Sequence, residues 1–571
     1  MLSVIFIWLY MAVTAFLLGY GILTGLSSFV SYRVKRWDSY VICGLAGAAV
    51  YAQFFSIFAS VGLAADLMFI AICLLIAFLC RKRLREDWKR LGGSRREESN
   101  FSGKKVFVKG LLSALLLLLY AYGASRGILH YDTALYHAQS IRWIEEYGIV
   151  KGLGNLHCRL AYNSASFALS ALYSMAFLGG QSFHCAAGFL ALVVASVCLK
   201  LGRAVKRKEL RPSDFARVAC IYYLLMIYDE MISPASDYFM VLTAFYLIIS
   251  WMDLMEEKEK AVFPYAMLCV LGVFLMTIKL SAALIVLLVC VPAAVLLREK
   301  RWKEIGIYIG LGILTAAPFL IRNVLLSGWL VYPFTGLDLF HVDWKIPKGI
   351  AAYDAKEIQV WGRGYSDVTK FDMPVWEWLP TWFRGLGGMD KLFVLAAMLS
   401  IAVFVVRFFF WLVRKEREKS GKLFLEGVVS LCFLFWLFSS PLIRYGCVYV
   451  YLTTAVVWGD SCTELFGSAR RKDRKAGQYA EKACMLLIGL FLFYKAAAFG
   501  KEIFTSYVDD YWLCQKDYDN YETRSYEIEG LLFYCPVEGD RVGYESFPSS
   551  PTEAQIRLRG NGIGDGFRYA E

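Results

Sequence analysis

Long apolar runs recur along the whole chain and alternate with short polar or basic segments. Runs of roughly 15 to 25 apolar residues are long enough to cross the hydrocarbon core of a bilayer as a helix. The runs close to this length are 3–26, 39–60, 62–80, 106–125, 182–201, 215–233, 236–252, 261–279, 281–297, 304–325, 391–413, 425–440, 446–459 and 481–499. The pattern predicts an all-α polytopic membrane protein with about 13–15 transmembrane helices and further helices in its outward-facing loops.

The basic segments between these runs predict which side each loop occupies. If the spans alternate, the Lys- and Arg-rich connections fall on one side, which marks the cytoplasm. These connections are 32–36, 81–105, 203–211, 256–260, 298–303, 414–422 and 470–475. The alternation holds only if the apolar stretch 165–180 does not cross, so we expect a re-entrant or surface-lying helix there.

This alternation divides the chain into six expected parts. Three are groups of membrane helices, at 1–125, 182–326 and 391–499. The others face outward: a loop at 126–181 with a candidate catalytic site, an aromatic-rich loop at 327–390, and a polar tail at 500–571. We expect the tail to form a small lid or cap.

Composition supports a membrane protein and disfavours a nucleic-acid-binding or zinc-binding protein. The chain is 58% hydrophobic with a formal net charge of +12, but its cations cluster between apolar runs, so nucleic acid is not an expected partner. Its 15 cysteines show no CxxC spacing, which disfavours a zinc site. Cys514 and Cys535 lie in the polar tail and could be bridged if the tail is outside the cell.

The segment after the fourth span carries the densest candidate chemistry. If 131–147 is helical, Asp132, Tyr136 and Gln139 share one face at spacings i, i+4 and i+7, and Arg142 lies three residues further on. A carboxylate at a water-accessible membrane edge can accept a proton from an attacking hydroxyl, which makes Asp132 a candidate general base. The alternative is that Asp132 only caps the helix that begins at Thr133.

A second polar stretch, Gly152–Asn163, supplies Asn155, His157, Arg159 and Asn163. Amide, imidazole and guanidinium groups of this kind recognise sugars, although a plain solvated loop would also be polar. The tryptophans of the 327–390 loop could stack on sugar rings, but membrane-interface belts use the same residues and explain most of them.

Three cations map to the outer rim of the predicted bundle. Lys279 and Arg322 end apolar spans, and Arg444 sits in a Pro-Leu-Ile-Arg-Tyr-Gly turn. A planar guanidinium can grip a phosphate through two parallel hydrogen bonds. For Lys279 and Arg322 the alternative is a helix-end cation whose head reaches the interface.

The segments that contain these residues resemble segments of known membrane protein families. The chain resembles the GT-C superfamily of multispanning glycosyltransferases, and more closely a family of uncharacterised bacterial polytopic membrane proteins. Five segments carry the closer likeness: Tyr131–His137, Gly152–Leu160, Arg322–Pro333, Asp338–Pro347 and Arg559–Phe567.

The GT-C likeness implies a GT-C-like fold and an inverting transferase in the bacterial inner membrane, with its active site facing the periplasm or exterior. Asp132 is then the catalytic base, and a polyprenyl-phosphate-linked sugar is the donor for a glycan, lipid or protein acceptor. The donor phosphate is expected near Arg322, Arg444 or Lys279. We expect substrate contacts from the polar residues of the 126–181 loop and no metal or other cofactor. These contact residues are Tyr131, Tyr136, His137, Arg142, Asn155, His157, Arg159 and Asn163.

Two other functions remain open at this stage. An O-antigen-type polymerase or ligase shares lipid-phosphate handling, large outward loops and rim arginines with a transferase. A lipid-linked oligosaccharide transporter should instead place charges at mid-bilayer on broken helices and show related halves, and neither is evident.

Overall fold

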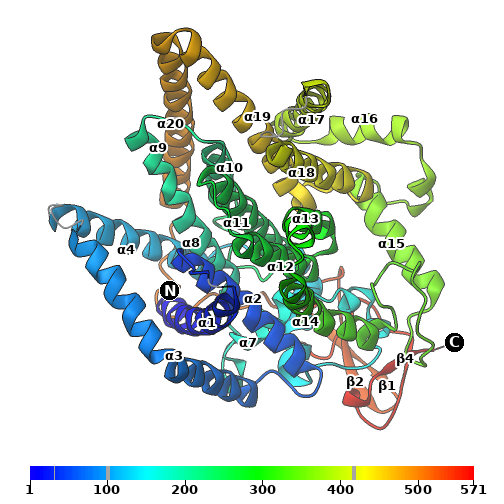
Figure 1. The fold of residues 1–571 in the computed structure, drawn as a ribbon. Coiled ribbons are helices and arrows are strands. Elements are labelled where there is room, and N and C mark those ends of the chain that lie inside the picture. The colour runs from blue at the N-terminus through cyan, green and yellow to red at the C-terminus, as the bar shows by residue number, and fades with distance from the viewer. Residues whose placement is uncertain (31, 98–102, 415–419, 571) are drawn as a thin grey trace.

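The computed structural model describes residues 1–30, 32–97, 103–414 and 420–570, and it is mainly helical (Figure 1). The first half of the chain forms α1 (Leu2–Phe29), α2 (Trp37–Ser56), α3 (Leu63–Glu97), α4 (Gly103–Ser125), the π-helix η2 (Thr133–His137), α5 (Ala138–Glu146), α6 (Leu153–Leu156), the 3-10 helix η3 (Cys158–Ala161), α7 (Ala165–Leu172), α8 (Ala186–Cys198), α9 (Gly202–Arg207), α10 (Pro212–Met226), α11 (Ser236–Glu256) and α12 (Val262–Ile278). The second half forms the 3-10 helix η6 (Leu280–Val289), α13 (Cys290–Arg298), α14 (Trp302–Ser327), α15 (Lys348–Gly362), α16 (Val375–Gly385), α17 (Gly388–Arg414), α18 (Ser420–Ser439), α19 (Ile443–Lys472) and α20 (Arg474–Thr505). Four strands follow: β1 (Thr523–Ile528), β2 (Leu531–Pro536), β3 (Ile556–Leu558) and β4 (Phe567–Tyr569).

The polytopic helical fold is confirmed. Within the described residues, 10 helices are long and apolar enough to cross a membrane, and each coincides with a predicted span. The other predicted spans correspond to the shorter apolar helices α4 and α12, and to α10 and α19. Helices α10 and α19 pack against each other and against α11, so they need not be apolar on every side.

Close helix packing in the bundle depends on glycine at two facing positions. A Cβ on Gly19 of α1 would lie 1.8 Å from the carbonyl oxygen of Tyr40, and a Cβ on Gly44 of α2 would lie 1.7 Å from that of Ala15. Only a residue without a side chain lets the two backbones approach this far. Close approach of this kind drives helix association in lipid, where there is no hydrophobic force between helices.

The 165–180 stretch does not form a long helix. Helix α7 has 8 residues, all of them buried, so it rises only about 12 Å, which is too short to cross. It packs against α2, α5 and α12 inside the protein. A short helix enclosed by protein agrees with the expected re-entrant segment, whereas a helix lying on the surface does not.

The tail departs from the all-α expectation because it contains two small antiparallel sheets, β1–β2 and β3–β4. The β1–β2 turn is Glu529-Gly530, and both residues have positive φ, as tight two-residue hairpins require. Cys514 is exposed, Cys535 is buried in β2, and both are free thiols, so the bridge considered from the sequence is absent.

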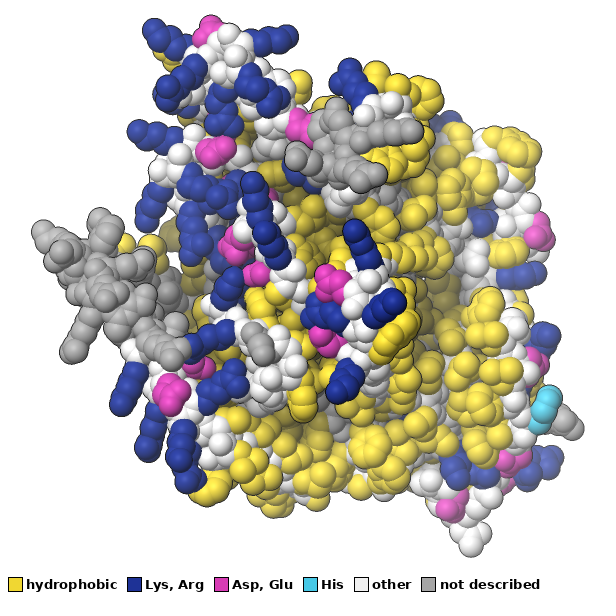
Figure 2. Space-filling view, viewed as in Figure 1, with side chains coloured by type: hydrophobic (Ala, Val, Ile, Leu, Met, Phe, Trp, Pro, Cys, Tyr) yellow, Lys and Arg dark blue, Asp and Glu magenta, His cyan; other side chains and the backbone are white. Residues whose placement is uncertain are grey.

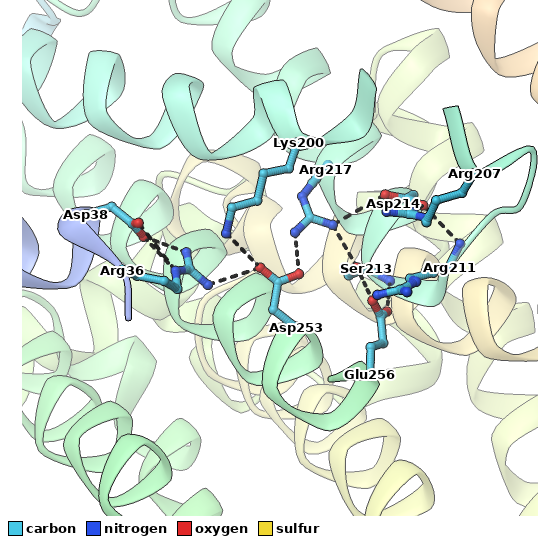
Figure 3. Close-up of polar contacts among 10 residues, drawn as sticks. All are labelled: Arg36, Asp38, Lys200, Arg207, Arg211, Ser213, Asp214, Arg217, Asp253 and Glu256. Atoms are coloured by element: carbon cyan, nitrogen blue, oxygen red, sulfur yellow. Dashed lines mark hydrogen bonds and ion pairs between the residues drawn. The ribbon is translucent and has the colours of Figure 1, made fainter. Parts of the chain in front are cut away.

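The opposite end of the bundle carries many of the basic residues. Figure 2 shows a broad apolar surface, with Lys and Arg gathered over α9 and the hairpin between α19 and α20. Several cations at this end are partly or fully buried in a network of charges (Figure 3). Asp253 of α11 accepts from Arg36 at 3.0 Å and from Lys200 at 3.2 Å, and it also pairs with Arg217. This network ties α11 to the start of α2, the end of α8 and the start of α10.

Removing the central carboxylate of this network should destabilise the fold. In Asp253→Asn three partly or fully buried cations lose their shared anion, and breaking a buried pair costs about 3–5 kcal/mol. We expect a clearly lower melting temperature for the purified protein in detergent. The control is Glu299→Gln, whose side chain is 51% exposed beside Arg301 and should change stability by at most about 1 kcal/mol. Equal shifts in both variants would contradict a structural role for the network.

Candidate functional site

Asp132 and Arg444 form the centre of the candidate site. They lie 312 positions apart in sequence, and Nη2 of Arg444 donates to Oδ2 of Asp132 at 2.6 Å. The Asp132 side chain is 9% exposed and that of Arg444 is 31% exposed. Asp132 precedes η2 but makes no capping hydrogen bond to it. The structure therefore gives this carboxylate a guanidinium partner in place of the capping role considered from the sequence.

The local backbone explains how Asp132 is held. Residues 133–137 form a π-helix that runs into α5, a rare turn that is frequent at functional sites. Its first residue, Thr133, is anchored by a 2.6 Å hydrogen bond to Ser233. The backbone N–H of Asp132 donates to Nδ1 of His130 at 3.1 Å. The carboxylate thus extends from a backbone that is fixed on both sides.

Two histidines beside the pair are held neutral. Burial, and after it the Arg444 guanidinium, lowers the pKa of His130, whose ring accepts a hydrogen bond from Arg444. Burial, and after it His130, lowers the pKa of His137 well below its ordinary value. Burial and then the Asp132 carboxylate raise the pKa of Tyr136. Arg444 is therefore the cation that faces Asp132 at neutral pH.

Lys279 joins the same site through Tyr445. Its Nζ lies 3.7 Å from the centroid of the Tyr445 ring, and the guanidinium carbon of Arg444 lies 5.0 Å from that centroid. Lys279 also pairs with Asp237 at the start of α11. The site therefore contains two cations and two carboxylates, supplied by the ends of α12, α11 and α19 and by the loop before η2.

Arg322 was expected near the other two rim cations, but it lies in a different environment. It is 3% exposed, its Nε donates to Oδ1 of Asn163 at 3.2 Å, and it bonds Ser56 of α2. Asn163 also donates to the side chain of Asn323 at 3.0 Å. In the described part of the chain, no hydrogen bond or ion pair joins Arg322 to Asp132 or Arg444. The structure thus brings together Lys279 and Arg444 but not Arg322.

The face expected to hold Asp132, Tyr136 and Gln139, with Arg142 three residues further on, does not present one common site. Nε2 of Gln139 donates to the carbonyls of Gly543 and Ser546, both at 2.9 Å. Arg142 donates to the tail carbonyls of Tyr544 at 2.7 Å and Glu545 at 2.8 Å. Both side chains therefore hold the tail, whereas Asp132 points to Arg444.

Tyr131 also contacts the tail, through a hydrogen bond to Asp540. The backbone N–H groups of Val542 and Gly543 both donate to the carbonyl of Ala134 in η2 at 2.9 Å. The tail is therefore fastened to the segment that carries Asp132. The sequence suggested a lid but gave no sign of which residues would hold it.

The residues of the second polar stretch have separate roles. Asn155 donates to the carbonyl of Trp344 at 2.8 Å, and Arg159 lies 4.6 Å from the centroid of Trp361. Arg159 is half-buried and within electrostatic range of Asp132. Burial, and then Arg159, lowers the pKa of His157 to about 3. Among the described residues, none of these side chains forms a hydrogen bond or ion pair with Asp132.

One buried carboxylate near this stretch was missed from the sequence. Asp354 of α15 accepts hydrogen bonds from Tyr162 at 2.6 Å and Tyr332 at 2.8 Å. Burial raises its pKa despite these bonds. Nothing in the surrounding residues 348–362 distinguishes it from an ordinary helix carboxylate. Three tryptophans of the same loop region are also buried in packing, where neither a sugar nor the membrane interface contacts them: Trp329, Trp378 and Trp382.

Comparison with known proteins gives a family but no characterised relative. Residues 1–451 match the model of a family described as a domain of unknown function (DUF8201). The match contains Asp132, Lys279, Arg322 and Arg444 and ends before the tail. No curated protein and no solved structure matches the chain. Among the described residues, no group of three or more His, Cys, Asp or Glu side chains is arranged to hold a metal ion.

The buried, neutral His137 predicts a pH dependence of stability. Because its pKa is lower in the folded protein than in the unfolded chain, protonation favours unfolding. Its stabilising effect is complete above about pH 6.5 and is lost, at up to about 1.4 kcal/mol per pH unit, as the pH falls below that value. We expect the melting temperature to fall from pH 7 to pH 5, and to fall less in His137→Gln. Exposed His341, replaced by Gln, is the control and should leave the slope unchanged. An unchanged slope in His137→Gln would show that this histidine is not held neutral.

Proposed function

The chain belongs to the DUF8201 family, and we propose that it is a membrane glycosyltransferase of GT-C type. It moves a sugar from a polyprenyl-phosphate-linked donor to a glycan, lipid or protein acceptor at the outer face of a bacterial cytoplasmic membrane. The observation that carries the proposal is the contact of Asp132 with Arg444, because a carboxylate that could act as a base and a guanidinium that could bind a phosphate lie within one hydrogen bond of each other.

In the proposed reaction Asp132 acts on the acceptor. Its carboxylate takes the proton of an acceptor hydroxyl while that oxygen forms a bond to the anomeric carbon of the donor sugar. The bond from this carbon to the phosphate oxygen breaks, and its electron pair stays on the phosphate. Direct attack inverts the anomeric configuration, and the products are the glycosylated acceptor and the free lipid phosphate.

Arg444 and Lys279 act on the leaving group. The phosphate gains negative charge as the bond breaks, and fixed cations beside it lower the barrier. Arg444 suits this task because its planar guanidinium can hold two phosphate oxygens at once. Lys279 adds a second charge from across the Tyr445 ring. Arg159, half-buried and within range of Asp132, is placed to orient the substrate.

The charge pairing also suggests how donor binding prepares the base. Without substrate, Arg444 is neutralised by Asp132 and Lys279 by Asp237. A donor phosphate competes for Arg444, and as the guanidinium turns to it, the Asp132 carboxylate is released from this partner. The carboxylate is then free to accept the proton of the acceptor hydroxyl.

The positions of the site and of the basic loops also indicate how the protein is oriented in the membrane. The site and the tail lie at the end of the bundle opposite the buried network of Asp253. Basic loops favour the cytoplasm, so we assign the network to the cytoplasmic face and the site to the outer face. We assign Arg322 a supporting role, since its bonds to Ser56 and Asn163 fix α14 against α2.

The test is a transfer assay on purified protein in nanodiscs, with a panel of polyprenyl-phosphate sugars as donors and release of lipid phosphate as the measurement. Loss of a general base typically costs about 10²- to 10⁴-fold in rate, and we expect a loss in that range for Asp132→Asn. Arg444→Gln should also lose most activity, and Arg444→Lys less. Asp509→Asn, on the exposed stretch after α20, is the matched control and should be fully active. Normal activity in a folded Asp132→Asn protein would eliminate Asp132 as the base, and no release from any donor would contradict the proposed reaction.

A further inference from the structure

A polar cavity of about 510 Å³ lies where the tail meets the end of the bundle, away from Asp132. Its apolar lining comes from Ile57 after α2, Ile149 after α5, and Leu325 near the end of α14. Its polar lining comes from Lys151 and from the glycine-rich loop 559–565 of the tail. Figure 1 shows the strands of the tail beside the end of α14. The volume is within the range of about 300–1000 Å³ typical of small-molecule sites.

The cavity is built from segments that are far apart in sequence. The N–H of Gly152 donates to the carbonyl of Leu325 at 2.8 Å, and the N–H of Phe567 donates to the carbonyl of Lys151 at 2.9 Å. Gly152 has φ +71°, and a Cβ there would lie 2.1 Å from the carbonyl oxygen of Phe567. Four of the five segments that carried the family resemblance meet here: Gly152–Leu160, Arg322–Pro333, Asp338–Pro347 and Arg559–Phe567.

The charges around the cavity nearly cancel. Arg559 donates to both oxygens of Asp343, at 2.8 and 3.2 Å, and to the carbonyl of Asp565 at 3.0 Å. The Asp565 carboxylate accepts one hydrogen bond, from the N–H of Gly562 at 3.0 Å. Lys151 is in no ion pair within the described residues. An anion would therefore meet one unpaired cation but also the carboxylates of Asp343 and Asp565, which disfavours a phosphate.

We propose that this cavity binds a saccharide unit of the acceptor. Sugar hydroxyls both donate and accept, so they can donate to the Asp565 carboxylate and the Asn561 amide oxygen and accept from Lys151. The apolar face of a pyranose ring can pack against the isoleucine and leucine side chains of the lining. A neutral, hydroxyl-rich ring satisfies this mixed lining, whereas a phosphate or an alkyl chain satisfies only part of it.

The position of the cavity indicates a long acceptor. Asp132 and Glu146 lie at opposite ends of η2 and α5, which a helical rise of 1.5 Å per residue places about 20 Å apart, and Ile149 of the cavity follows three residues after Glu146. A single sugar cannot span that distance. An acceptor held in the cavity and reacting at Asp132 must therefore contain several sugar units, which narrows the acceptor class to an oligo- or polysaccharide. This step rests on the proposed function, but saccharide binding by the cavity does not.

Binding can be tested without any donor. The full chain in nanodiscs is titrated with oligosaccharides of neutral hexoses, N-acetylhexosamines and hexuronates, and separately with inorganic phosphate, with saturation-transfer NMR as the readout. We expect at least one oligosaccharide to bind, and Asn561→Leu and Lys151→Met each to weaken its binding by about tenfold. Arg557→Gln, on the exposed side of β3, is the control and should bind normally.

Asp132→Asn should bind the saccharide as the unmodified chain does. A failed transfer assay would therefore count against the proposed function, whereas a failed binding assay would count against saccharide binding by the cavity. The proposal is overturned if no oligosaccharide binds. It is also overturned if Asn561→Leu and Lys151→Met bind the saccharide unchanged while remaining folded, or if inorganic phosphate displaces it.

Discussion

The ion pair between Asp132 and Arg444 is the interaction on which this account depends. It joins a loop that follows the fourth predicted span to a helix that begins more than 300 residues later, so it exists only when the whole bundle is assembled. A half-buried pair of this kind contributes little net stability, because desolvation of both charges offsets their attraction. The proposed function gives this pair a chemical role.

The buried charges of the two ends of the bundle serve different purposes. At the basic end, Asp253 is shared by three cations and the surrounding carboxylates are also engaged, so the network locks helices together (Figure 3). At the tail end, each of the two site cations has one carboxylate partner and one face against Tyr445. A cation with a single carboxylate partner can turn to an incoming phosphate, whereas the Asp253 carboxylate is shared by three cations.

The membrane helices were predictable because an apolar run of sufficient length has few other stable structures in lipid. Asp132 and the cations Lys279 and Arg444 could be singled out as candidate site residues, since ionisable groups near membrane depth are costly. Their pairing could not, because it depends on how distant helix ends meet. Arg322 looked equivalent to Arg444 in sequence, yet its neighbours Ser56 and Asn163 come from segments whose proximity only the fold reveals. The strands of the tail were overlooked, although alternation in 523–528 and the Glu529-Gly530 turn signal a hairpin.

The most direct measurement of the central claim is an experimental structure of the full chain in nanodiscs with a polyprenyl phosphate bound. The account predicts the phosphate within hydrogen-bond distance of Arg444 and Lys279, with the Asp132 carboxylate released and facing the site. A phosphate bound elsewhere, with the contact between Asp132 and Arg444 intact, would contradict it.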